Sequence, residues 1–365
     1  MSQIRTFQNT SLDVESEKSD SLFSALTFLV IEKLVLNPLH ALTSVSGVIT
    51  NVLNLMVLTG LGMTSRSNVG VIALSITDLF MSATEMIITS SYFISYLCPD
   101  LLFDFQSMIS KLLGWIRYPG FFISTWITTF ISIERCVSVV YPFRAKQMFS
   151  VKRNSAIILC ISCLYMGTVY QIFSSLTLSY NEKPSSEMNS SKGEAIIVTF
   201  TFTQDTSDVE MIIDIVCAMF LSILCQVVLI VCTALMICAL KYSSQVRRPQ
   251  IEDHNSSGRH TSDGLFHGSL LTPKERRMIK VTLCLALVIT GCNFPRYVIV
   301  ILFYSMLALD LDKYYELTFC LWIFSDFLIS LYSSCNFFVY LKLNSKFRKR
   351  LFWIFSINKQ KLNSL

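Results

Sequence analysis

Seven long apolar stretches, joined by polar segments, limit what this chain can fold into. A helix needs roughly 20 largely apolar residues to cross a bilayer. Each stretch is long enough, and together they cover about residues 40–62, 69–97, 112–139, 154–178, 209–240, 276–307 and 315–341. No internal repeat relates these stretches, which weakens the interpretation as a transporter built from inverted repeats. The stretches predict an all-α membrane protein, a seven-transmembrane helix bundle.

The composition agrees with a membrane protein. Hydrophobic residues make up 52% of the chain and charged residues only 15%, whereas soluble domains carry about 25% charged residues. The first residues, MSQIRTFQNT, are polar and lack the basic-then-apolar pattern of a signal peptide. We therefore expect the first apolar stretch to act as an uncleaved insertion signal.

The charge distribution predicts the orientation. Most of the 30 Lys and Arg lie on one side of the spans, between Arg135 and Arg153, between Lys241 and Lys280, and from Lys342 onward. Because cytoplasmic loops carry the excess of Lys and Arg, we expect the N-terminus outside and the C-terminus in the cytosol of a plasma-membrane protein. The net charge of +5 fits this topology and attraction to anionic inner-leaflet lipid, and nothing in it indicates nucleic acid.

This topology divides the chain into an extracellular tail (1–39), a seven-transmembrane domain (40–341) with a third cytoplasmic loop at about 241–275, and a cytoplasmic tail (342–365). Two glycosylation sequons, at Asn9 and Asn189, fall on the outer side, where glycosylation occurs.

An acid and a base end the third span. Glu134 and Arg135 lie at its cytosolic end, and Glu275 begins the sixth span at the same level. An arginine at a span end can simply extend to the headgroups. Alternatively, Arg135 pairs with Glu275 and holds the inner ends of two helices together until activation separates them.

Several motifs then occur in the order and at the span ends typical of one receptor family. They are LSITD (74–78), ERC (134–136) with Pro142 seven residues after Arg135, CNFP (292–295) and NFFVY (336–340). Through these motifs the chain resembles the rhodopsin-like (class A) G-protein-coupled receptors over about residues 40–355. The resemblance implies a short amphipathic eighth helix and a heterotrimeric G protein that Arg135 and Pro142 contact. It also implies a switch that includes a hinge at Pro295 and an inward movement of Tyr340.

The chain also departs from that family. Ser110 stands where the family's third-span disulfide cysteine is expected, and no Cys occurs in residues 180–210. Cys98 and Cys320 are outer-side cysteines that an oxidising compartment would allow to pair. With these departures the chain resembles a divergent invertebrate branch of the family, similar to molluscan-type chemosensory or peptide receptors.

The resemblance also implies a polar core. Asp78, Ser124, Ser333 and Asn336 occupy the positions that surround an allosteric sodium ion in the family. Oxygen ligands suit a hard cation. The alternative is a hydrogen-bonded cluster without an ion.

Four more charges lie nearer the outer side of the spans: Glu85, Arg117, Arg296 and Asp326. At 1.5 Å per residue, Arg117 lies about 27 Å above Arg135, and the other three fall at a similar depth. Two readings are open. The four residues form two internal salt bridges, Arg117–Glu85 and Arg296–Asp326, or they line a ligand pocket of mixed charge.

Residue types at these positions exclude some ligands. Ser330 stands where opsins carry the retinal-binding lysine, so bound retinal is excluded. Arg117 replaces the aspartate of amine receptors, and its fork of donors suits a carboxylate or peptide terminus. Peptides, amino acids and carboxylated chemosensory cues remain as small-molecule or peptide ligands.

We expect no enzymatic activity, because the sequence shows no catalytic constellation, and no cofactor beyond the sodium ion considered above. His254, His260 and His267 lack metal-ligand spacing. A G-protein-coupled receptor is thus the favoured function, and a seven-span ligand-gated channel or an ion-coupled transporter is the alternative.

Overall fold

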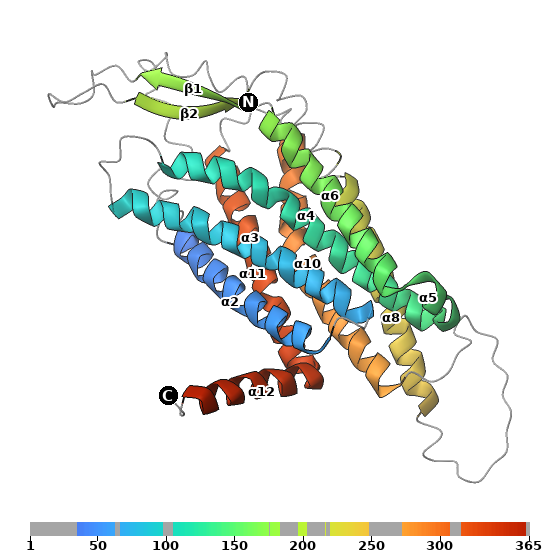
Figure 1. Ribbon diagram of the computed structural model, residues 1–365. Coiled ribbons are helices and arrows are strands. Elements are labelled where there is room, and N and C mark those ends of the chain that lie inside the picture. The colour runs from blue at the N-terminus through green and yellow to red at the C-terminus, as the bar shows by residue number, and fades with distance from the viewer. Residues whose placement is uncertain are drawn as a thin grey trace, which may run out of the picture.

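A computed structural model of the chain describes residues 35–62, 66–97, 105–174, 176–182, 196–202, 216, 220–247, 272–306 and 315–362. Seven long helices dominate it (Figure 1): α2 (Asn37–Gly60), α3 (Arg66–Leu97), α4 (Phe105–Val140), α6 (Val151–Ser174), α8 (Ser222–Arg247), α10 (Pro273–Met306) and α11 (Tyr315–Leu343). Two shorter helices, α5 (Pro142–Met148) and α12 (Ser345–Leu362), lie at one end of the bundle, and a hairpin of β1 (Leu176–Glu182) and β2 (Ile196–Phe202) lies at the other.

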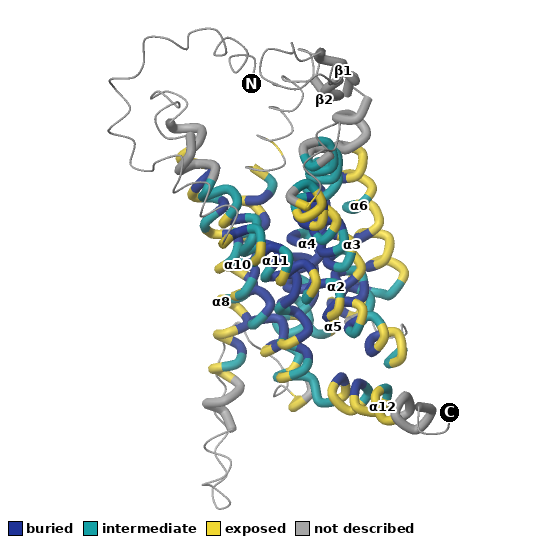
Figure 2. Tube along the Cα trace, turned by 90° about the vertical axis from the view of Figure 1, so that its left-hand side faces the viewer, coloured by how far each residue is buried: buried dark blue, intermediate teal, exposed yellow. Residues whose placement is uncertain are grey.

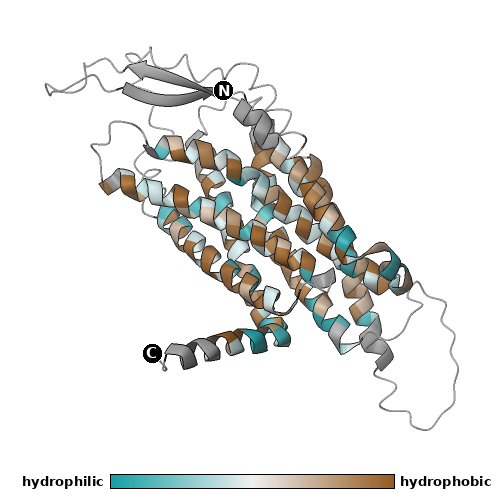
Figure 3. Ribbon diagram, in the orientation of Figure 1, coloured by the Kyte–Doolittle hydropathy of each residue, from teal (hydrophilic) through white to brown (hydrophobic). Residues whose placement is uncertain are grey.

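Six of these helices are long and apolar enough to cross a membrane: α2, α3, α4, α8, α10 and α11. The helix α6, with 24 residues, packs against α3 and α4 as the seventh member of the bundle. Figure 3 shows apolar residues along all seven. The predicted all-α seven-helix membrane fold is confirmed, and the chain is a multi-pass membrane protein.

The bundle has α4 at its centre. This helix contacts α3, α6, α8 and α10, and Figure 2 shows buried residues concentrated on the inward helix faces and exposed residues outside. The main apolar core includes Ile127, Leu74, Val57 and Phe347. Many exposed side chains on the outer faces are large and apolar, for example Phe294 on α10, as a lipid-facing surface requires.

Local sequence signals set the helix ends. α2 ends where Gly62 adopts the left-handed conformation (φ 91°), and the Gly62 amide donates to the Thr59 carbonyl at 3.1 Å. α4 ends before Tyr141, whose backbone is non-helical (φ −131°, ψ 70°), as expected for a residue that precedes proline. Pro142 then begins α5. The Asn344 side chain caps α12, since its Oδ1 accepts from the amides of Lys346 (3.2 Å) and Phe347 (3.3 Å).

Three boundaries differ clearly from the prediction. The third span was expected from residue 112, yet α4 begins at Phe105. The fourth span was expected to run through residue 178, yet α6 ends at Ser174 and the antiparallel β1–β2 hairpin begins at Leu176. The strand β2 (IIVTFTF) consists entirely of β-branched and aromatic residues, which favour strands over helices, whereas β1 (LTLSYNE) contains only Thr177 and Tyr180 of this kind. The fifth helix continues past residue 240 to Arg247, into the segment that we assigned to the third loop.

Candidate functional site: the charge network and the cavity at opposite ends of the bundle

Arg117 links two carboxylates at the hairpin end of the bundle. Its Nη1 donates to Oε2 of Glu85 on α3, and its Nη2 donates to Oδ2 of Asp326 on α11 at 2.8 Å. Arg296 on α10 reaches the other oxygen of Asp326, with Nη1 donating to Oδ1 at 2.7 Å. The four predicted charges therefore form one continuous network across α3, α4, α10 and α11. Both expected ion pairs are present, and the Arg117–Asp326 contact joins them.

Aromatic rings hold the Arg296 guanidinium in place. Its Cζ lies 4.9 Å from the centre of the Trp322 ring, 5.3 Å from that of Phe121 and 5.4 Å from that of Tyr118. Guanidinium groups over aromatic faces are attracted by the ring quadrupole. Rings from α4 and α11 thus hold Arg296 in place. This arginine directly follows Pro295 in α10.

His40 on α2 extends the network, and the sequence reasoning missed it. Its Nδ1 lies 2.8 Å from Glu85 Oε1, and its Nε2 lies 3.1 Å from the Ile323 carbonyl oxygen. A carbonyl oxygen only accepts, so Nε2 donates to Ile323, and Nδ1 faces the Glu85 carboxyl group. His40 thus joins α2 to both α3 and α11. An available signal was that His40 is the one histidine of the chain within an apolar span.

Burial is unequal across the network. The side chains of His40, Glu85 and Arg296 are 6–8% exposed and that of Arg117 is 16% exposed, whereas that of Asp326 is 30% exposed. The guanidinium groups of Arg117 and Arg296 face the two carboxylates of Glu85 and Asp326. The most accessible member of the network is the Asp326 carboxylate.

The predicted polar core is assembled around Asp78 in the middle of the bundle. Its Oδ1 accepts from Ser124 Oγ at 2.8 Å, and its Oδ2 accepts from Asn336 Nδ2 at 2.6 Å. Ser333 Oγ donates to the Asp78 carbonyl oxygen at 3.2 Å. Tyr332, which the sequence reasoning did not include, has its hydroxyl 3.1 Å from Ser124 Oγ.

All four predicted oxygen-bearing residues are thus brought together, and side chains already occupy both Asp78 carboxylate oxygens. The Oδ1 atom of Asn336 is buried, with no hydrogen-bond partner among the described residues. A carboxylate, two hydroxyls and this amide oxygen form a donor set of the type that a hard cation takes. Sodium binding at this site stays a prediction.

The opposite end of the bundle carries Glu134 and Arg135. Glu134 is buried and its Oε2 accepts from Asn154 Nδ2 on α6 at 3.2 Å, and Arg135 Nη2 lies 3.6 Å from Glu134 Oε1. Glu134 therefore ties α4 to α6 through Asn154, a partner that the sequence reasoning missed.

The predicted ion pair between Arg135 and Glu275 is not formed. Glu275 Oε2 instead accepts from the amide and the hydroxyl of Thr272, both at 2.8 Å, and the Glu275 amide donates to Thr272 Oγ1 at 3.2 Å. This reciprocal arrangement is a capping box at the start of α10. The sequence TPKE at 272–275 carries that signature, so the local hydrogen bonds explain why Glu275 does not reach for Arg135.

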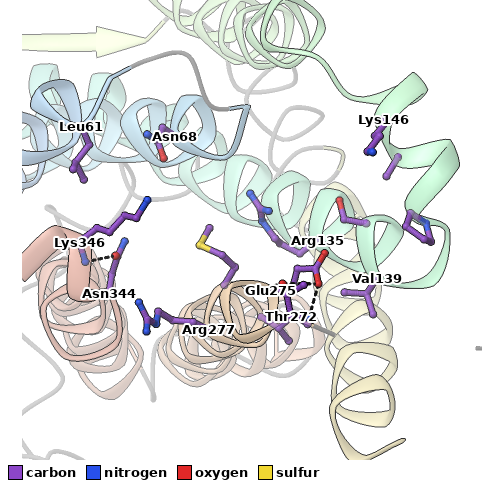
Figure 4. A pocket seen from close by; sticks show the side chains of 15 residues that line it. Leu61, Asn68, Arg135, Val139, Lys146, Thr272, Glu275, Arg277, Asn344 and Lys346 are labelled. Carbon is purple, nitrogen blue, oxygen red and sulfur yellow. Dashed lines mark hydrogen bonds between the residues drawn. The ribbon is translucent and has the colours of Figure 1, made fainter. Parts of the chain in front are cut away.

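Arg135 and Glu275 nevertheless line the same cavity, shown in Figure 4, with a volume of about 530 Å³. Residues from α3, α4, α5, α10 and α12 surround it, among them Asn68, Pro142, Arg277 and Lys346. The two residues expected to contact a transducer, Arg135 and Pro142, thus border one hollow at one end of the bundle.

The remaining switch residues lie on α10 and α11. Pro295 is inside α10, where a proline removes a backbone hydrogen bond and weakens the helix locally. Tyr340 is buried, and its ring centre lies 5.9 Å from that of Phe347 on α12.

Comparison with known families is decisive for the class. The model of the family described as serpentine-type 7TM GPCR chemoreceptor Srw matches residues 38–358. The chain belongs to this chemoreceptor family. The family is one of receptors rather than enzymes, and the match confirms the predicted resemblance to a divergent, chemosensory branch of G-protein-coupled receptors. No curated protein matches the sequence.

Other predicted sites fall outside the described residues. They are the glycosylation sequons at Asn9 and Asn189, and Cys98, which was expected to form a disulfide with Cys320. The finer resemblance to molluscan-type receptors also stays a prediction.

Proposed function

We propose that this chemoreceptor binds a carboxylate-bearing ligand, such as a short peptide, an amino acid or a carboxylated metabolite, at the network of His40, Glu85, Arg117, Arg296 and Asp326. The observation that supports this most directly is that Asp326, the most accessible member, bridges two arginines. A ligand carboxylate offers both guanidiniums the same acceptors as Asp326, and the forked donors of arginine suit it. The released Asp326 side chain is already 30% exposed, so its carboxylate can be solvated.

Exchange at Asp326 acts directly on the sixth transmembrane helix. Arg296 is held to α11 through Asp326 and follows the proline of α10. A ligand that replaces Asp326 removes this link between α10 and α11. The link lies next to Pro295, where the helix lacks a backbone hydrogen bond. The ligand then shifts the equilibrium toward a state in which α10 is displaced, to the extent that it binds this state more tightly than the closed state.

The far end of α10 is where the proposal places the response. Its capping residues Thr272 and Glu275 border the cavity that Arg135 and Pro142 also line. Outward movement of α10 widens this cavity and lets a heterotrimeric G protein enter. In this orientation α5 and α12 face the cytosol and the β1–β2 hairpin faces outward, as the distribution of Lys and Arg predicts.

A calcium assay in cells that express the chain with a promiscuous Gα subunit tests this function. Amino acids, carboxylic metabolites and short peptides serve as the panel, and surface expression is measured in parallel. We expect Arg117→Gln to weaken responses to carboxylate ligands by about 10- to 100-fold, as loss of a charge-assisted hydrogen bond implies. Responses to matched amidated ligands should change by less than about threefold. An unchanged response to carboxylates at equal surface expression would refute the proposed ligand site.

The channel and transporter alternatives predict a different readout. A ligand-evoked current in cells that lack G-protein signalling would support the channel instead of the receptor. A substrate flux in such cells would support the transporter. Mid-membrane Asp78, bonded to Ser124 and Asn336, is the residue on which an ion-coupled transporter would depend.

A further inference from the structure

The cavity at the α5/α12 end has the size of a small-molecule site. Its volume is about 530 Å³, within the range of roughly 300–1,000 Å³ usual for ligand pockets. A helix with its side chains is about 10–12 Å across, so this volume holds roughly one helical turn. In this closed conformation the cavity is thus too small for a protein helix that enters by several turns, and large enough for a compact ligand.

The charges that line the cavity select the chemistry of that ligand. Four cations come from four different elements: Arg135 (α4), Lys146 (α5), Arg277 (α10) and Lys346 (α12). Among the described lining residues Glu275 is the one acid, which gives four cations against one anion. The Glu275 carboxylate is already engaged by Thr272. A cleft lined by one sign of charge concentrates ions of the opposite sign.

The polar groups around the cavity also favour an anion. The first residues of α10 and α12 border it through Thr272 and Asn344, and helix N-termini carry the positive end of the helix dipole. Figure 4 shows Arg277, Lys346 and Asn344 on one side of the hollow and Arg135 with Glu275 on another. Arg277 also donates to Ser345 Oγ, which fixes α10 to the start of α12.

We propose that this cavity binds a phosphate-bearing anion that bridges α4, α10 and α12. One or two phosphate monoesters, each with a charge of about −1.5 to −2 at neutral pH, offset the excess of cations, of which Arg135 is already partly compensated by Glu134 at 3.6 Å. The anion comes either from a soluble polyphosphate or from the headgroup of a phosphorylated inositol lipid beside α12. By holding the inner end of α10 to its neighbours, the bound anion stabilises the closed state. That regulatory consequence rests on the proposed coupling to a G protein, whereas binding itself does not.

Direct binding to the purified full-length chain tests the site. In phosphatidylcholine nanodiscs the chain is titrated with tritiated inositol hexakisphosphate, at an ionic strength held constant with inorganic phosphate. We expect saturable binding that is at least about tenfold weaker in Arg277→Gln/Lys346→Gln. The matched control is Lys280→Gln/Lys349→Gln, which removes the same charges from exposed positions of the same two helices outside the cavity. The control should bind within about threefold of wild type.

A second arm separates the two sources. The same proteins are placed in nanodiscs that contain a few per cent of a fluorescent phosphatidylinositol bisphosphate, and energy transfer to the labelled lipid is measured. Binding of the lipid alone assigns the headgroup, binding of the soluble anion alone assigns a free polyphosphate, and mutual competition assigns one shared site. Equal binding by the double variant and the control, or no saturable binding in either arm, would overturn the proposal. Neither result depends on G-protein coupling.

Discussion

Arg117 is the residue on which the outer network depends, because its guanidinium contacts carboxylates from two other helices. A lysine offers a point charge rather than a fork and could not hold both partners in the same plane. Removing this arginine would leave Glu85 and Asp326 as carboxylates facing each other near the membrane interior, without the cation between them.

The first prediction follows from that geometry. Arg117→Gln should lower the free energy of unfolding by about 3–5 kcal/mol, as is usual when one partner of a buried ion pair is removed. Adding Glu85→Gln to it should restore part of the loss, since one uncompensated carboxylate is then gone. Thermal unfolding of the purified protein measures both, and a single variant as stable as wild type would contradict the network.

His40 leads to a second prediction, on stability. Its buried ring joins Glu85 on α3 to the Ile323 carbonyl on α11. His40→Ala should lower the free energy of unfolding by about 1–3 kcal/mol, because it leaves buried polar partners without a hydrogen bond. Thermal unfolding of the purified protein measures the loss, and a variant as stable as wild type would contradict the role of this contact.

At the residue scale the sequence predicted the charged groups but not all their partners. Charges within apolar spans stand out, so Glu85, Arg117, Arg296 and Asp326 could be identified and placed at one depth by helical rise. The pairs Arg117–Glu85 and Arg296–Asp326 were one of the predicted alternatives, but the contact that joins them, Arg117–Asp326, depends on helix rotation, which periodicity does not fix. Asn154 and Tyr332 carry no charge and could not be distinguished from ordinary packing residues.

At the scale of single helices, the start of α10 shows how local bonds override a longer-range expectation. Glu275 was expected to pair with Arg135, yet it caps its own helix through Thr272. A cap forms between residues three apart and requires no tertiary contact, so it competes well against an exposed ion pair, which contributes little.

The third prediction distinguishes the cap from the ion-pair lock. Glu275→Gln keeps a capping residue and removes the charge, so basal signalling should stay within about twofold of wild type. A lock broken by the same change would raise basal signalling several-fold. Basal second-messenger levels at matched surface expression decide between the two. As a control, Thr272→Ala removes the cap and should cost about 1 kcal/mol of stability.

The helix α12 is anchored by one aromatic residue. Phe347 is fully buried, and its ring centre lies 5.8 Å from that of Phe337 on α11. The opposite side exposes Phe352 and Trp353, and basic residues accompany them, as in helices that lie along a membrane surface. The amphipathic pattern predicted this helix, but only the structure identifies the residue that holds it.

A fourth prediction tests the anchor. Phe347→Ala should cost about 3–5 kcal/mol, the usual loss for a buried phenylalanine, and should increase amide exchange throughout α12. Phe352→Ala, on the 66% exposed position of the same helix, should change neither by a comparable amount. Equal effects of the two substitutions would mean that α12 is held by lipid rather than by Phe347.

At the scale of the whole molecule, two polar sites lie at opposite ends of the same helices. α4 carries Arg117 near one end and Arg135 near the other, and α10 carries Arg296 and Glu275 in the same way. The fold itself was predictable, because apolar stretches long enough to span a bilayer leave few alternatives to a helical bundle. The β1–β2 hairpin was not, because β1 begins within the apolar stretch expected to end at about residue 178, and β2 precedes the stretch expected to begin at about residue 209.

The central claim is that a ligand at the outer network controls nucleotide exchange at the inner end. The measurement that tests it most directly is GTP analogue binding by a purified G protein with the receptor in nanodiscs, using the most potent carboxylate from the cell assay. We predict that the ligand accelerates exchange with wild type. At the concentration that half-saturates wild type, Arg117→Gln should abolish the acceleration, because it removes a guanidinium that the ligand carboxylate contacts. Arg135→Gln should bind the ligand normally and still fail to accelerate exchange. Ligand-independent exchange, or acceleration that survives both substitutions, would contradict the account.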